Sequence, residues 1–288
     1  MPVKAEVRGF TLIELLIVIA IISILVGLVV VAASSMLLQS KSSKDLANHR
    51  TIGAATWSHT IDHNGELLNP RTEPDADNST QSQIDRFWVR AYDDDFSVRL
   101  ESDGTEKEES LKDGAAFQYI GSIDAYRSPL DPTNRLRSYS MSAYIGVIDG
   151  IDDYVGYNIP GLQEFFFPSL TASQISQPSG TMCTITEDDR RRSANWNGWM
   201  LHPREDMPFL RWYDFPAFWM EYGVNISHVD GSTQTVLLSS DALMEGWKQV
   251  NESNSDSWND PQKATLADFK KLRRKLLPGK IGSILDRD

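Results

Sequence analysis

Cysteine is almost absent from this chain of 288 residues. The one cysteine, Cys183, excludes a disulfide within the chain, so the core alone must hold the fold. Basic residues number 28 against 40 acidic ones, and the net charge of −12 argues against nucleic acid as the main partner. The sequence also lacks a G-x-S-x-G nucleophile motif, a glycine-rich phosphate loop and a C-x-x-C pair. We therefore expect no enzyme active site and no cofactor, and we expect Cys183 to fill a core position.

Metal-binding residue types are present without a metal-binding pattern. His59 and His63 share a helical face, a spacing that suits zinc, but Thr60 stands where a metalloprotease motif has its glutamate. Two acidic stretches, at residues 71–83 and 93–109, offer carboxylates to a divalent cation, yet neither has EF-hand spacing. We expect the histidines to be polar residues near a helix end and the acidic stretches to be solvated, with no metal site.

What the sequence does contain is one long apolar run, from Leu15 to Ala33, interrupted only by Ser23 and Gly27. At about 1.5 Å per helical residue, its 19 residues approach the thickness of a bilayer core. Glu14 stands directly before this run, where a lone carboxylate is costly unless some partner neutralises it. The partner of Glu14 is therefore the main question that the sequence raises.

Three interpretations of the apolar run compete. A secretory signal peptide would use Lys4 and Arg8 as its charged start, but its apolar segment is usually shorter and does not begin with a glutamate. A plain membrane anchor leaves Glu14 unexplained. The third interpretation, a helix that polymerises with copies of itself, gives the carboxylate a partner on another subunit.

Residues 8–14, RGFTLIE, resemble the processing site of type IV prepilins and type II secretion pseudopilins. The resemblance implies that a prepilin peptidase cuts between Gly9 and Phe10 and methylates the new amino group of Phe10. It further implies that Glu14, at the fifth mature position, pairs with the amino terminus of a neighbouring subunit, because a buried carboxylate is tolerated only when paired. Repeated contacts of this kind build a helical filament.

The resemblance also implies a subcellular location and an order of domains. Lys4 and Arg8 favour a cytoplasmic N-terminus, so we expect a single-pass protein of the bacterial inner membrane, with its head in the periplasm or outside the cell, that then enters a filament. The expected domains are a cleaved leader at 1–9, a transmembrane and polymerisation helix at 10–62, and a globular head at 63–288.

The expected fold class is α+β, with a long pilin-like helix followed by a head that contains an antiparallel sheet. We predict a helix from about Phe10 to about Asp62, stopped by Asn64-Gly65. Its second half carries a loose apolar stripe formed by Leu37, Leu38, Leu46, Ile52 and Trp57. In the head we predict strands at Leu136–Ile145 and Thr181–Thr186, an exposed turn at Asn195–Trp199, a hairpin at Val224–Leu238, and a last helix from Asp260-Pro261 to about Leu277.

The hairpin is the second place where the chain resembles pilin-like proteins. Asp230-Gly231 is a favoured two-residue turn, and the hairpin resembles the C-terminal signature named for a His, nine residues and Asp-Gly. The match is degenerate, because Met220 stands in place of that His and Ser232 in place of the His that often follows the glycine. We expect His228, within the hairpin, to be structural.

The predicted last helix has an apolar face and a basic side. The basic residues are Lys270, Lys271, Arg273, Arg274 and Lys275. They form either a docking surface for an acidic partner or anionic lipid, or the solvated outer face of a helix packed on the head. We favour the second interpretation.

Together these observations favour a structural subunit of a type IV pilus or of a type II secretion pseudopilus, two assemblies that the sequence does not distinguish. Its expected partners are the prepilin peptidase, other pilin or pseudopilin subunits and the inner membrane, with no nucleic acid. The alternative is a membrane-anchored exported binding protein or enzyme that does not polymerise.

Overall fold

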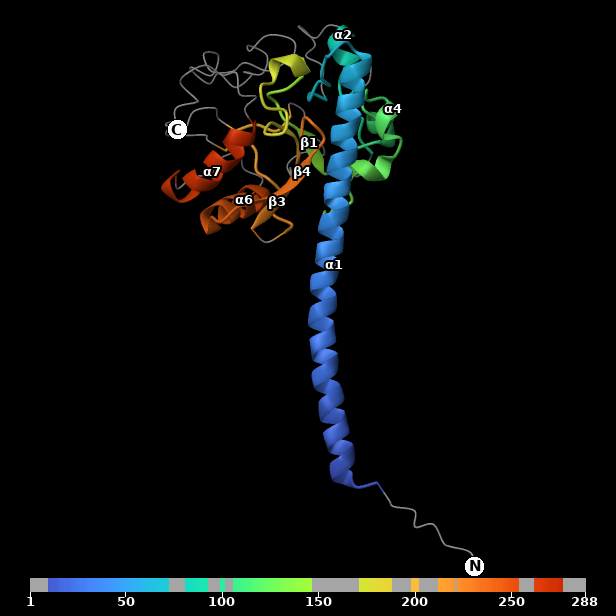
Figure 1. Cartoon of the computed structure of the whole chain (residues 1–288), viewed down its shortest axis with the longest axis vertical. Helices are drawn as coiled ribbons and strands as arrows, with labels where there is room; N and C mark the ends of the chain where they lie inside the picture. The colour runs from blue at the N-terminus through green and yellow to red at the C-terminus, as the bar shows by residue number, and fades with distance from the viewer. Residues whose placement is uncertain are drawn as a thin grey trace, which may run out of the picture. The chain divides into compact units, whose positions relative to one another are not determined.

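The computed structural model of the chain describes residues 10–72, 81–92, 99–101, 106–146, 171–187, 198–201, 212–220, 222–253 and 262–276. Contacts divide the chain into two compact units, Met1–Lys41 and Ser42–Asp288. Helix α1, Leu12–Asp62, contributes to both (Figure 1). The domain limits predicted after residues 9 and 62 stay predictions.

Helix α1 is long because its sequence contains nothing that stops it. Leu12–Asp62 has no proline and only two glycines, Gly27 and Gly53. The helix ends at Asp62, as predicted, because Asn64 and Gly65 take positive φ values of 55° and 92°. The Gly65 N–H then donates to the Thr60 carbonyl at 2.8 Å.

In the first unit, the large apolar side chains of α1 are exposed in the described part of the chain. The large ones between Leu12 and Leu38 are 43–81% exposed. By length and composition this part of α1 is able to cross a membrane. Such a surface requires lipid or other helices around it.

In the second unit, the described strands form one antiparallel sheet in the order β1-β2-β3-β4. The strands are β1 (Tyr139–Met141), β2 (Met182–Thr186), β3 (Gly223–His228) and β4 (Thr233–Leu237). Helices α6 (Asp241–Ser253) and α7 (Gln262–Leu276) lie on one side of this sheet, and the second half of α1 lies on the other (Figure 1). The predicted α+β class with an antiparallel sheet is thereby confirmed.

The two faces of the sheet differ in chemistry. Toward α6 and α7 the face is apolar, with Ile185 and Ile226 in one cluster with Phe269 and Leu272. Toward α1 the face carries hydroxyl and amide groups, described with the site. The register of β2 against β3 shifts between Met182 and Thr184.

A second core lies around the end of α1. It contains Leu67, Leu68, Trp88 and Tyr126. Five short helices accompany it: α2 (Gln81–Ile84), α3 (Glu108–Lys112), α4 (Phe117–Ile120), η1 (Ile123–Tyr126) and η2 (Ala172–Gln174). The short helices and α6 were not predicted.

The hairpin is present, but its turn differs from the prediction. Strand β3 ends at His228 and β4 begins at Thr233, so four residues connect them where a two-residue turn was predicted. The reason is local hydrogen bonding: Asp230 Oδ1 accepts from the Ser232 backbone N–H at 2.9 Å and from its hydroxyl at 2.6 Å. Gly231 takes φ 82° within this loop.

Two other predictions for the head were wrong in part. The strand predicted at 136–145 is only Tyr139–Met141, because Ser142 forms an isolated bridge with Trp199 and a turn follows at Ala143 and Tyr144. Trp199, predicted in an exposed turn, is fully buried and its backbone exchanges hydrogen bonds with Met141 and Ala143. Residues 195–197 lie outside the described part of the chain. The neighbouring glycine, Gly198, suggests a surface turn, but the Trp199 side chain fills the core.

The apolar stripe on the second half of α1 is not the face that the helix buries. Of its five members only Ile52 is buried, and Trp57 is 42% exposed. The buried face of α1 is instead mostly polar, and it begins with Asp45, Asn48 and His49.

Candidate functional site

The start of α1 holds the residues that the sequence singles out for processing and assembly. Thr11 directly precedes the helix, and its side chain and backbone exchange hydrogen bonds with Glu14, at the third helical position. Glu14 Oε2 accepts from the Thr11 backbone N–H and from the Thr11 hydroxyl, both at 2.8 Å, while the Glu14 backbone N–H donates to Thr11 Oγ1 at 3.3 Å. This reciprocal arrangement is a capping box.

The capping box answers part of the question that Glu14 raises. In the single chain its carboxylate already has hydrogen-bond donors, and they come from Thr11. This box was not predicted, although Thr-x-x-Glu before an apolar run is its sequence signature. Phe10, one residue earlier, is 73% exposed, and Gly9 lies outside the described residues. Phe10 thus lies just before α1 and Glu14 in its first turn, and their predicted roles stay predictions.

A buried polar interface joins the second half of α1 to the sheet. Asp45 accepts hydrogen bonds from the Tyr139 hydroxyl and from Asn225 Nδ2, each at 2.7 Å. His49 lies one turn further along, with its two ring nitrogens 2.7 Å from Thr184 Oγ1 and 2.9 Å from Thr186 Oγ1. These groups come from α1, β1, β2 and β3, so they tie the helix to three strands.

The chain of Asp45, His49 and hydroxyl groups resembles a catalytic relay in composition only. His49 is fully buried, and Asp45 is equally inaccessible. Burial, opposed by the charge of Asp45, lowers the pKa of His49 to about 4, so the ring is neutral at neutral pH. Burial also raises the pKa of the Tyr139 hydroxyl. No substrate can reach these groups, and their arrangement serves to hold α1 on the head.

Acid is expected to weaken the head through His49. The unfolded chain takes up a proton on His49 near its ordinary pKa of 6.5, whereas the buried ring resists protonation until about pH 4. The neutral His49 ring thus contributes up to about 3 kcal/mol to the free energy of unfolding. This contribution is complete above about pH 6.5 and is lost as the pH falls toward 4. Urea unfolding between about pH 7 and pH 4.5 should show a flatter dependence for His49→Gln than for the parent chain. Equal slopes for the two proteins would contradict this prediction.

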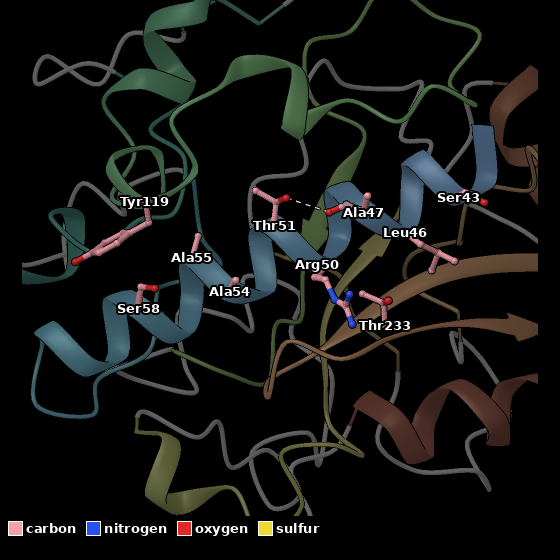
Figure 2. Close-up of a pocket in the computed structure, with 10 residues that line it drawn as sticks. All are labelled: Ser43, Leu46, Ala47, Arg50, Thr51, Ala54, Ala55, Ser58, Tyr119 and Thr233. Carbon is pink, nitrogen blue, oxygen red and sulfur yellow. Dashed lines mark hydrogen bonds between the residues drawn. The ribbon is translucent and has the colours of Figure 1, made fainter. Parts of the chain in front are cut away.

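An open groove of about 640 Å³ runs along the outer side of α1 (Figure 2). Small side chains of α1 form much of its surface, Tyr119 of α4 and Thr233 of β4 border it, and the Thr51 hydroxyl donates to the Ala47 carbonyl at 3.0 Å. Among its ten lining residues only Arg50 and Tyr119 carry groups that titrate. The groove therefore has no acid–base pair among these residues.

The remaining candidate residues have structural surroundings. Cys183 is buried as predicted, and burial raises the pKa of its thiol to about 11. His228 is buried, with its Nε2 2.6 Å from Gln234 Nε2. His59 and His63 lie at the end of α1, as predicted, and burial together with His63 lowers the pKa of His59 to about 4. The acidic stretches at 71–83 and 93–109 lie largely outside the described residues.

Helix α7 is packed on the head. Its apolar face joins the cluster between the sheet and helices α6 and α7, through Phe269, Leu272 and Leu276. Of the five residues on its basic side, Arg273 is buried and Lys271 donates to the Leu237 carbonyl at 3.0 Å. These contacts favour the interpretation of a packed helix over that of a docking surface.

Comparison with known families finds a match at the start of the chain. Residues 5–30 match the model of the prokaryotic N-terminal methylation motif. No curated protein and no solved structure matches the chain. The degenerate likeness of the hairpin to the His, nine residues and Asp-Gly signature stays a prediction. The matched segment covers the capping box and most of the apolar run of α1, and the match supports a type IV prepilin-like protein.

Proposed function

We propose that this protein is a structural subunit that is cut after Gly9, methylated on Phe10 and assembled into a type IV pilus or a type II secretion pseudopilus. The observation that carries the proposal is the methylation motif at residues 5–30, which leads directly into an uncovered apolar helix. The chemistry of processing belongs to the peptidase, and the subunit itself catalyses no reaction. Its work is to polymerise through α1 and to display an acidic head.

The position of Glu14 supports the same proposal. The Thr11 backbone N–H that it now engages belongs to the residue next to the future amino terminus. After cleavage, the positive amine of Phe10 on a neighbouring subunit supplies a stronger partner for the carboxylate than the neutral donors of Thr11. Cells would hold the precursor in the inner membrane with its N-terminus in the cytoplasm and its head on the far side.

Mass spectrometry of the N-terminus tests the proposal. The mature protein should begin at Phe10 and carry one methyl group on its amino nitrogen. Gly9→Leu should leave the leader attached, whereas Gly27→Ala should be processed normally, because nothing lies within 4 Å of the added Cβ. Mature protein that keeps Met1, or that starts near Ser34 as a signal peptidase product, would favour the anchored binding protein or enzyme that does not polymerise.

A further inference from the structure

A short polar segment separates the two halves of α1. The first half exposes large apolar side chains as far as Leu38, and Asp45 is the first residue that the second half buries. Between them lie residues 39–44, QSKSSK, which belong to the same helix and are here named the collar. Lys41 and Lys44 are the only charged residues of the collar, and both are exposed. Because they are three positions apart, they share one side of α1.

The collar lies where a bilayer around the apolar half of α1 would end. The helix from Glu14 to Lys41 is about 40 Å long, at about 1.5 Å per residue. A bilayer with its headgroup regions is about 40–45 Å thick. With Glu14 at the headgroups of one leaflet, Lys41 and Lys44 therefore reach the headgroups of the other.

No described residue supplies a counter-charge to the two lysines. Neither Lys41 nor Lys44 forms an ion pair or a side-chain hydrogen bond with another described residue. Asp45 stands four positions after Lys41, where a carboxylate on a helix can pair with a lysine. Its two oxygens instead accept hydrogen bonds from Tyr139 and Asn225 of the sheet.

Other basic side chains of the described head do have carboxylate partners. Acidic residues outnumber basic ones by 40 to 28 in the chain, so partners are plentiful. Ion pairs are formed by Arg86, Arg99, Lys112, Arg135, Arg137 and Lys271. Two unpaired cations at the level of a membrane surface therefore indicate a counter-charge outside the chain.

We propose that Lys41 and Lys44 bind the phosphate groups of anionic lipids where α1 leaves the membrane. The ammonium group of lysine is a compact charge on a flexible stem, which suits phosphate groups that move with their lipids. Each such lysine strengthens binding to an anionic surface about fivefold. The contact offsets the repulsion between that surface and a chain with a net charge of −12. The inference rests on insertion of α1 into a membrane, but not on cleavage after Gly9 or on assembly.

Electron paramagnetic resonance of spin-labelled lipids tests the proposal on the full-length chain in phosphatidylcholine vesicles. The spectrum gives the fraction of labelled lipid that the protein immobilises, measured once with labelled phosphatidylglycerol and once with labelled phosphatidylcholine. We expect the parent chain to prefer phosphatidylglycerol, and Lys41→Ser with Lys44→Ser to reduce this preference at least about fivefold. Lys4 and Arg8 add to the preference of both proteins, so the difference between the two isolates the collar.

Two control proteins carry matched changes. Lys41→Arg with Lys44→Arg keeps both charges and should keep the preference. Lys112→Ser with Lys248→Ser removes the same charge from exposed positions of α3 and α6, and it should also leave the preference unchanged.

The proposal is overturned if the collar serine variant prefers phosphatidylglycerol as strongly as the parent chain does. An equal loss in the variant of Lys112 and Lys248 would overturn it too, because net charge alone would then explain the effect. If the collar serine variant keeps its lipid preference but is missing from filaments, the lysines meet an acidic surface of a neighbouring copy instead. None of these results bears on N-terminal processing, which mass spectrometry tests separately.

Discussion

A chain carrying Glu14→Leu is expected to enter the membrane as well as the parent chain, or better, and to be missing from filaments. Insertion improves because an acidic group at the start of an apolar segment is replaced by an apolar one. Assembly fails because the amine of a neighbouring Phe10 then has no counter-charge inside the bundle. Quantification of the variant in membranes and in sheared filaments should show incorporation at least about a hundredfold lower.

Two further variants separate charge from hydrophobicity and from helix capping. Ser23→Leu makes a similar apolar change in the same run, where the serine hydroxyl donates only to the Ile19 carbonyl, and it should assemble. Glu14→Gln keeps an acceptor for Thr11 but has no charge. If pairing with the amine governs assembly, Glu14→Gln fails as Glu14→Leu does. Normal assembly of Glu14→Gln would refute the pairing and leave only the capping role.

The Gly146→Ala substitution should destabilise the head by more than about 4 kcal/mol. Gly146 has φ 77°, which costs about 1–2 kcal/mol for a residue with a side chain. In addition, its Cβ would lie 1.7 Å from the Leu68 carbonyl oxygen. Leu68 is fully buried in the second core, so its backbone has little room to move away. Urea unfolding, followed by tryptophan fluorescence, measures the loss.

Gly121→Ala is the matched control for this prediction. Gly121 has φ 69°, but nothing lies within 4 Å of an added Cβ. Its cost should therefore be only the backbone term of about 1–2 kcal/mol. Similar stability of the two variants would show that the close approach of Gly146 to Leu68 does not constrain the head.

The parts of the fold that follow from local sequence were predictable. The end of α1 at Asn64-Gly65, the strand Met182–Thr186 and the last helix Gln262–Leu276 each have a clear pattern or stop signal. Residues 8–14 predicted the methylation motif, whose model residues 5–30 match. These features depend on neighbours in the chain, so one sequence is enough to find them.

The contacts between distant segments were not predictable in the same way. The apolar stripe of α1 does not mark its buried face: Leu46 and Trp57 are not buried. The polar residues Asp45, Asn48 and His49 are. A polar side chain is stable inside only if another segment brings it a partner, here Asn225 and Thr184 more than 130 positions away. The local sequence of α1 does not indicate that Asn225 and Thr184 are its partners.

The polar interface between α1 and the sheet has a mechanical consequence. An apolar helix can shift by one turn along an apolar surface at little cost in free energy, because one apolar contact replaces another. The bonds of Asp45 to Tyr139 and Asn225 allow no such exchange, since a shift leaves each group facing the wrong partner. A force along the axis of α1 would act on all of these hydrogen bonds in shear at the same time. They would therefore resist separation of the head from the second half of α1.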